Sequence, residues 1–363
     1  MISCSKARTT WAASRQLAIG SVTAVLLLLP VNAAFAATVH MLETGSTLLY
    51  PLFNMWVPAY SKAHPEVQIT TQGTGSGTGI SEASSGIAQI GASDAYMSNA
   101  QITQEKGVLN TPLTISSQMI NYNLPSLNNI HLNLSGPVLA GIYSGKITYW
   151  DDPELKKLNP SVSLPHSAII PVHCTDGSGD TFIFTQYLSF STPSWGKGPG
   201  YGTTVSWPPV QGGIGAEGNP AMVNTAKNNP YSIAFIGISF ENAINSTGLG
   251  TAALENRSGQ FVLPTEQTME AAVKATAPKT PKDERISLIF APGPDSYPII
   301  NYEYAIVRNQ QPNPELAKSL KAFLNWAISP QGGSAPHFLK AVNFVPLPPV
   351  IATLSKEQIA MIQ

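Results

Sequence analysis

Three segments of the chain follow one local plan, and this plan restricts the possible folds more than any other feature of the sequence. In each segment, an apolar stretch suited to a strand (38–42, 67–69 and 168–172) leads into a loop rich in Gly, Ser, Thr and Asp, and a helical pattern follows. Strands that alternate with helices favour α/β layers with mainly parallel sheets. The sequence therefore predicts an α/β protein.

Further segments continue this alternation of strands and helices. The helices expected after the first and third loops have one apolar face each. The residues expected on these buried faces are Leu52, Phe53, Trp56, Tyr60, Ile183, Phe184, Tyr187 and Leu188. We also expect strands at 87–90, 232–240 and 302–307, helices at 266–274 and 316–328, and an exposed polar stretch at 279–284.

The first 36 residues have the pattern of a secretory signal peptide. Lys6, Arg8 and Arg15 form a positive region, 17–30 is an apolar stretch too short to span a bilayer, and Ala34-Phe35-Ala36 is a small-residue cleavage signal. We expect cleavage after Ala36, with an uncleaved anchor as the alternative. The mature protein is therefore expected in the periplasm.

The mature chain has the size of two lobes and a slightly negative charge. Its 327 residues (363 − 36) exceed what one hydrophobic core usually serves. The signal segment holds three of the 20 positive charges and none of the 21 negative ones, which leaves 17 − 21 = −4. This balance argues against a nucleic-acid partner. We expect a monomer without a cofactor.

The cysteine and histidine content argues against a metal site and an enzyme. Cys174 is the only cysteine after residue 36, so the mature chain has no internal disulfide and no Cys-rich zinc site. The six His residues are scattered, with no H-x-x-x-H pair. Ser178 lies outside any G-x-S-x-G motif, and His173 and Cys174 are adjacent on an extended segment, where side chains point to opposite faces.

The three loops carry residues suited to an anion. A helix N-terminus has unpaired N–H groups and the positive end of the helix dipole, hydroxyls add donors, and glycine admits a ligand close to the backbone. Three such loops at one cleft would enclose an oxyanion with few formal charges. The candidate residues are Ser46, Thr47, Ser76, Ser178 and Gly179. Each loop alone could instead be an ordinary turn with a helix cap.

Two nucleotide-binding patterns fail in these loops. The G-x-G-x-x-G pattern begins with Gly73 and Gly75, but Thr78 stands at the third glycine position. No Lys-Ser or Lys-Thr follows a Gly-rich run, so a Walker-type loop is also missing.

Two carboxylates accompany these donors, Asp94 after the strand at 87–90 and Asp180 in the third loop. They would repel a fully ionised ligand and attract one that still has a proton to donate. Phosphate near neutral pH carries such protons and sulfate does not, so a carboxylate acceptor discriminates between the two anions. The alternative is that Asp94 and Asp180 only cap helices.

At these residues the chain closely resembles the phosphate-binding proteins of the bacterial phosphate-specific ABC transporter. The resemblance covers essentially the whole mature chain, with motifs in the family's order and spacing. These motifs lie at 45–56, 73–79, 91–94, 141–151, 176–182 and 297–305.

The resemblance implies the type II periplasmic-binding fold, with a ligand cleft between two α/β lobes that two crossover strands join. The crossovers would fall near 122–123 and 299–302, which places lobe I at 37–121 plus 302–363 and lobe II at 122–301. It also implies capture of inorganic phosphate in the periplasm and delivery to the permease subunits of an ABC transporter in the inner membrane.

The family's ligand contacts, carried over by motif, fall on all but one of the candidates named above and on one further backbone N–H. Asp94 would accept the proton of phosphate. The implied contact residues are Thr47, Leu48 through its backbone N–H, Ser76, Asp94, Ser178, Gly179 and Asp180.

One position departs from the family pattern, because Cys174 stands where the family usually has an Arg. That Arg would give the ligand a charged partner. Three interpretations stay open: phosphate binding is weaker or favours the monoanion, the ligand is another oxyanion or solute, or a Lys or His such as His173 supplies the charge. A surface adhesin that kept the fold and lost the ligand is a further alternative.

Overall fold

The structure is a computed structural model that describes residues 38–363, so the expected signal peptide lies outside the described residues. No helix in this part of the chain has the length and apolarity that crossing a membrane requires. The strands are β1 (Val39–Gly45), β2 (Val67–Gly73), β3 (Ile90–Ser93), β4 (Val108–Tyr122), β5 (Asn133–Leu134), β6 (Ile170–Cys174), β7 (Ile214–Ala216), β8 (Ser232–Gly237), β9 (Gly250–Thr251), β10 (Ala253–Glu255), β11 (Phe261–Val262) and β12 (Ile300–Arg308).

Helices alternate with these strands along the chain. The α-helices are α1 (Tyr50–Ala63), α2 (Ser76–Ser85), α3 (Asn99–Gln104), α4 (Gly136–Tyr143), α5 (Pro153–Leu158), α6 (Gly179–Ser191), α7 (Pro193–Lys197), α8 (Gly218–Asn228), α9 (Glu241–Thr247), α10 (Glu266–Thr276), α11 (Pro314–Ala327), α12 (Pro336–Leu339) and α13 (Pro349–Ala360). Short 3₁₀ turns are η1 (Ile238–Phe240), η2 (Ala277–Lys279) and η3 (Lys340–Val342).

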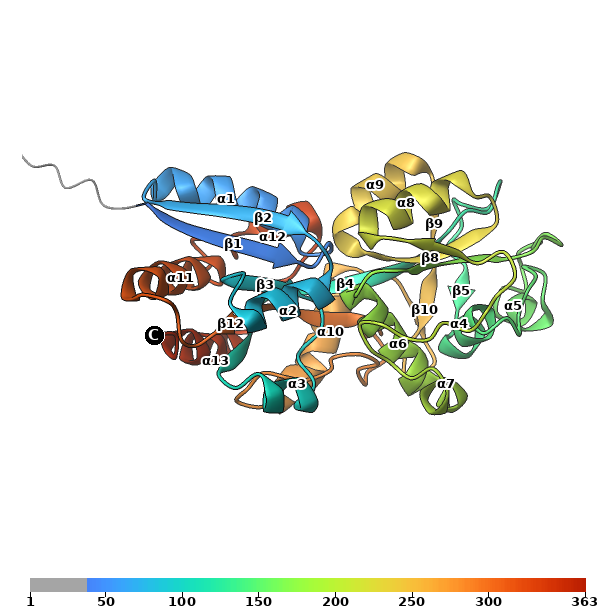
Figure 1. The fold of residues 1–363 in the computed structure, drawn as a ribbon. Coiled ribbons are helices and arrows are strands. Elements are labelled where there is room, and N and C mark those ends of the chain that lie inside the picture. The colour runs from blue at the N-terminus through green and yellow to red at the C-terminus, as the bar shows by residue number, and fades with distance from the viewer. Residues whose placement is uncertain (1–37) are drawn as a thin grey trace, which may run out of the picture. The chain divides into compact units, whose positions relative to one another are not determined.

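One long sheet, in the order β2-β1-β3-β12-β4-β8-β6-β7, connects two groups of elements (Figure 1). Strand β1 pairs in parallel with β2 and β3, and β6 pairs in parallel with β7 and β8. The long strand β4 belongs to both groups, because it pairs antiparallel with β12 up to Ser117 and with β8 from Gln118 onward. The alternating pattern thus produces two parallel cores joined by antiparallel strands, which confirms the predicted α/β class.

Helices cover each core, and two of them, α1 and α6, have the apolar faces that the periodicity predicted. Helix α1 packs on β2, α2 on β1 and β3, and α13 on β4, while α6 and α8 pack on β6 and β8. The eight face residues predicted for α1 and α6 are all buried. Full burial of a Leu, Ile or Phe side chain contributes roughly 1.5–3 kcal/mol, so these faces are what fix the helices to the sheet.

Two predicted strands have different ends in the structure. Gly86, at φ 78°, ends α2 in a left-handed turn, so Ile87 is 63 % exposed and β3 begins only at Ile90. Strand β8 ends at Gly237, whose N–H donates to the side chain of Asn219 (2.7 Å), and the chain continues as η1. In both places the local backbone structure at a glycine sets the end of the strand, although the apolar composition of the segment predicted a different end.

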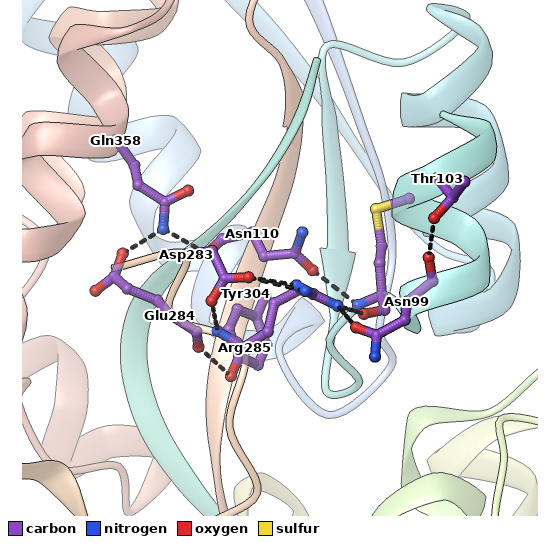
Figure 2. Close-up of polar contacts among 9 residues, drawn as sticks. Asn99, Thr103, Asn110, Asp283, Glu284, Arg285, Tyr304 and Gln358 are labelled. Atoms are coloured by element: carbon purple, nitrogen blue, oxygen red, sulfur yellow. Dashed lines mark hydrogen bonds and ion pairs between the residues drawn. The ribbon is translucent and has the colours of Figure 1, made fainter. Parts of the chain in front are cut away.

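The prediction that 279–284 is exposed is wrong for Glu284, which is fully buried. Its carboxylate accepts hydrogen bonds from Ser355 (2.9 Å) and Gln358 (2.6 Å) of α13. The adjacent Arg285 turns the other way, and its guanidinium donates to the Met97 carbonyl (2.9 Å) and to Asn99 (3.0 Å), as Figure 2 shows. This segment lies in the 122–301 stretch assigned to lobe II, and the lobe boundaries stay a prediction.

Glu284 makes stability depend on pH. Burial raises its pKa from 4.5 to about 8. The stability that its bound proton supplies is therefore fully present below about pH 4.5 and is lost as the pH rises through about 8. Between about pH 5 and pH 9, we expect the free energy of unfolding of Glu284→Gln, which cannot ionise, to fall by roughly 4 kcal/mol less than that of the wild type. Urea unfolding at both pH values measures this, and parallel losses in the two proteins would contradict it.

Candidate anion-binding site

The first loop places Ser46 directly after β1, four residues before α1 begins. Gly45 has φ 140°, and a Cβ on it would overlap the carbonyl oxygen of Ala92, so only glycine lets β1 end this close to β3. The Ser46 N–H donates to that carbonyl (2.9 Å), and the Ser46 hydroxyl accepts from the Leu49 N–H (2.9 Å). The loop therefore holds the Ser46 hydroxyl in one orientation.

Two of the predicted hydroxyls meet Asp94, which follows β3 directly and is 1 % exposed. The Ser46 hydroxyl donates to Oδ1 of Asp94, and the Ser76 hydroxyl, on the first residue of α2, donates to Oδ2 (3.2 Å). The Asp94 N–H donates back to Ser76 Oγ (3.1 Å). Asp94 caps no helix here, so the capping alternative does not account for it.

The third loop brings the N-terminus of α6 to the same place from the second group of elements. Ser178 is the N-cap of α6, and its hydroxyl accepts from the Thr181 N–H (3.2 Å). A Cβ on Gly179 would overlap Oδ2 of Asp94 and Oγ of Ser76 and would lie 2.6 Å from the Cβ of Asp94. The three loops thus converge around Asp94, as the sequence predicted.

Asn219 and Gln118 belong to the site although the sequence did not single them out. Asn219 Nδ2 donates to Oδ2 of Asp180 (2.7 Å) and to Oγ1 of Thr47 (3.0 Å). Gln118 Nε2 donates to Oδ1 of Asp180 (2.9 Å). Asn219 follows Gly218 at the start of α8, after β7, so a fourth strand–loop–helix unit was the available signal. Gln118 lies inside β4 and carries no such signal.

Leu48 is buried beside these residues. Its side chain packs against Gly237 of β8, and its carbonyl accepts from the Ser239 hydroxyl (2.7 Å). The role expected of its backbone N–H toward a ligand stays a prediction.

Buried carboxyl groups dominate the electrostatics of the site. Asp94, Asp180 and Glu303 are each at most 2 % exposed. Burial raises the pKa of Asp94 and of Asp180 well above the usual range, with the neighbouring acids as a further cause, and raises the pKa of Glu303 to about 7. None of the Lys and Arg ion pairs among residues 38–363 involves these groups. The site therefore favours protonated acids and a ligand of low charge.

Neither Cys174 nor its neighbour His173 supplies the positive charge of the missing Arg. Cys174, the last residue of β6, is 4 % exposed, its thiol contacts the Ser178 hydroxyl, and burial together with the charge of Asp180 raises its pKa. His173 turns away, and its ring stacks on Trp207 at 5.1 Å. The interpretation in which His173 supplies the charge is therefore wrong, because adjacent side chains of a strand face opposite sides.

A cavity of about 560 Å³ opens beside the convergence of the loops. Its lining includes Ala95 and Tyr96, just after Asp94, Phe182 and Thr203 from the second group, and Arg285. The Thr203 carbonyl also accepts from the Ser178 N–H (2.9 Å). Access to the site thus lies between the two groups of elements.

Comparison with known proteins agrees with this geometry. A family model described as a PBP superfamily domain matches residues 32–331. The phosphate-binding protein PstS of Methanocaldococcus jannaschii is 35 % identical over 352 residues, covering 92 % of this chain and 89 % of the relative. The chain belongs to the PstS family. A second PstS, from Pasteurella multocida, is 34 % identical over 304 residues, covering 84 % of this chain and 85 % of its own.

PstS proteins are solute-binding proteins of the PBP superfamily. Among solved structures, the phosphate-binding protein from Stenotrophomonas maltophilia superposes with a TM-score of 0.67 at 17 % identity, covering 88 % of this chain and 93 % of that chain. This similarity shows the fold, which is the two-lobed α/β fold of type II periplasmic-binding proteins. The predicted family and fold class are therefore confirmed.

Proposed function

We propose that this protein captures inorganic phosphate in the periplasm and delivers it to the permease of an ABC transporter for import. The observation that carries the proposal is the convergence of Ser46, Ser76 and the N-terminus of α6 on the buried Asp94. Hydroxyls and helix N-termini bind phosphate oxygens, and a carboxylate accepts the proton that phosphate retains. The names of the PstS relatives support the same ligand.

In this proposal each half of the site has its own role. Thr47, Leu48 and Ser76 bind phosphate from the first lobe, and Ser178, Gly179 and Asp180 bind it from the second. Asp94 accepts the ligand's proton, which excludes sulfate because sulfate has none to donate. Since no Lys or Arg pairs with the three buried acids, the monoanion of phosphate is the preferred form.

Transport follows from closure of the two lobes. An open form admits phosphate through the cleft lined by Tyr96 and Phe182, and contacts from both lobes then favour the closed form, a population shift set by differential affinity. The closed monomer presents a surface that the permease recognises. Nothing in this cycle requires chemical conversion of the ligand, so we expect no enzymatic activity.

Cys174 supports a second candidate, a binding protein of the same fold for a different oxyanion. The thiol is buried and neutral where a cation would otherwise face the ligand. An anion that needs less positive charge, such as a monoanionic phosphonate, would suit this site as well.

Calorimetric titration of refolded, ligand-free mature protein decides between these candidates. We expect phosphate to bind at micromolar concentration or tighter, more strongly at about pH 5.5 than at about pH 8, and sulfate to give no heat. Ser76→Ala serves as the site control and should weaken phosphate binding. Binding of a phosphonate without phosphate would favour the second candidate, and silence of every oxyanion would contradict both.

A further inference from the structure

Glu303 is a fully buried acid at the site to which the proposed function gives no role. It lies on β12 at a break in the pairing with β4, where Glu303 pairs with Thr114 but Tyr304 pairs with Pro112. Proline has no N–H for the ladder, so the strand accommodates it with a bulge that leaves Leu113 unpaired. Bulges re-aim the neighbouring side chains, and here the side chain in question is Glu303.

The two oxygens of Glu303 have different surroundings. Oε1 accepts from the Ser116 hydroxyl and from Asn301 Nδ2 (3.0 Å). Oε2 is buried and has no hydrogen-bond partner among the described residues. The Glu303 carboxyl group also interacts with the carboxyl group of Asp94. Asn301 Nδ2 also donates to the Asp94 carbonyl (3.2 Å), which holds the two acids together.

Two carboxyl groups in contact cannot both ionise, because like charges in a buried site repel strongly. The titratable groups that act on Glu303 are Asp94, after β3, and Asp180, on α6. The neighbouring positions of β4 and α2 contribute the neutral Ser116 and Ser76. One proton on the pair relieves this repulsion.

We propose that Asp94 and Glu303 share one proton, and that Glu303 is the positioning residue that lets Asp94 accept the hydroxyl of phosphate. Without ligand the proton lies on Asp94, which donates to Oε2 of Glu303. When phosphate presents its P–OH group, that proton moves to Glu303, which then donates to Asp94, and the Asp94 carboxylate accepts from the ligand. The pair carries a charge of −1 in both states, so no proton is taken up or released. This inference rests on the proposed function.

Two substitutions of Glu303 test whether the pair is responsible for the discrimination between phosphate and sulfate. In Glu303→Gln the amide oxygen can accept from Ser116 and Asn301, and the amide N–H can donate to an ionised Asp94. In Glu303→Leu the buried Asp94 has no partner to take its proton and keeps it. A protonated Asp94 donates a hydrogen bond. It therefore accepts poorly from the P–OH group of phosphate, and it no longer repels sulfate.

Titration of the refolded full mature chain with phosphate and with sulfate tests this. We expect Glu303→Leu to weaken phosphate binding by about ten-fold and to reduce the phosphate-to-sulfate affinity ratio by about ten-fold or more. Glu303→Gln is expected to keep the phosphate preference. Glu284→Gln, an identical change at a buried acid outside the site, is the matched control. A folded Glu303→Leu with the wild-type ratio would overturn the proposal.

Infrared spectra of the ligand-free proteins separate this inference from the proposed function. The wild-type-minus-variant difference spectra of Asp94→Asn and Glu303→Gln should each show the carbonyl band of one protonated carboxyl, and that of Glu303→Leu should show no such band. If wild type binds no phosphate, the proposed function fails, and these spectra still decide whether Asp94 holds the shared proton. If this band is missing from the difference spectra of both Asp94→Asn and Glu303→Gln, the shared-proton pair is refuted.

Discussion

Gly179→Ala is expected to reduce phosphate affinity by roughly ten- to a hundred-fold while the protein stays folded. A Cβ at this position overlaps Asp94 and Ser76, whose side chains are held by hydrogen bonds and cannot move aside. Overpacking of this kind costs about 1–3 kcal/mol, and about 1.4 kcal/mol is ten-fold in affinity. Gly179 lies in the first turn of α6, where alanine itself is favourable. The cost therefore falls on the approach of the two lobes.

The measurement is calorimetric titration with phosphate, together with the melting temperature. Gly196→Ala is the matched control, because Gly196 lies in helix α7 with its nearest neighbour, the Ser189 carbonyl oxygen, 3.2 Å from the added Cβ. We expect this control to bind like wild type. Wild-type affinity in Gly179→Ala would mean that α6 does not approach Asp94 in the bound state.

Cys174→Arg is expected to raise phosphate affinity by about ten-fold or more. The thiol lies beside Ser178 and near Asp180, so a guanidinium there would place a positive charge next to two of the predicted phosphate contacts. Two unit charges about 4 Å apart attract by about 4 kcal/mol at an effective dielectric constant of 20, and pairing with Asp180 and desolvation offset part of this. The larger side chain should also lower the melting temperature, because Cys174 is tightly packed.

Cys174→Ser is the control for this change, since it keeps the size and neutrality of the thiol and should bind phosphate within a few-fold of wild type. Equal affinity of folded Cys174→Arg and wild type would show that this position does not face the anion. Phosphate binding by Cys174→Arg alone would show that the natural protein has lost its ligand or has a different one.

The strand–loop–helix pattern allowed most of the site to be predicted, because each loop is short and its position is set by the strand before it. A glycine in such a loop indicates close approach of the backbone even when the contacting residue is unknown. This holds for Gly45, Gly75 and Gly179. The residues that the sequence did not reveal lie in strands or come from elsewhere in the chain. Gln118 and Glu303 face the site only because β4 and β12 meet beside it.

The buried acids illustrate the same limit from another side. Glu284 is the last residue of the polar stretch 279–284, whose composition predicts exposure to solvent. In the structure, α13 near the end of the chain covers this side chain. Local sequence carries no information about such distant partners. The charge state of the site was equally hidden, because it depends on three acids that are far apart in sequence and meet only after folding.

The most direct test of the central claim is a crystal structure of the mature protein grown with phosphate and a second grown with sulfate. We predict phosphate between Ser76, Asp94 and the N-terminus of α6, with one of its oxygens within hydrogen-bonding distance of an Asp94 carboxylate oxygen, and no anion there in the sulfate crystal. Phosphate bound elsewhere, or sulfate at this site with equal occupancy, would contradict the account.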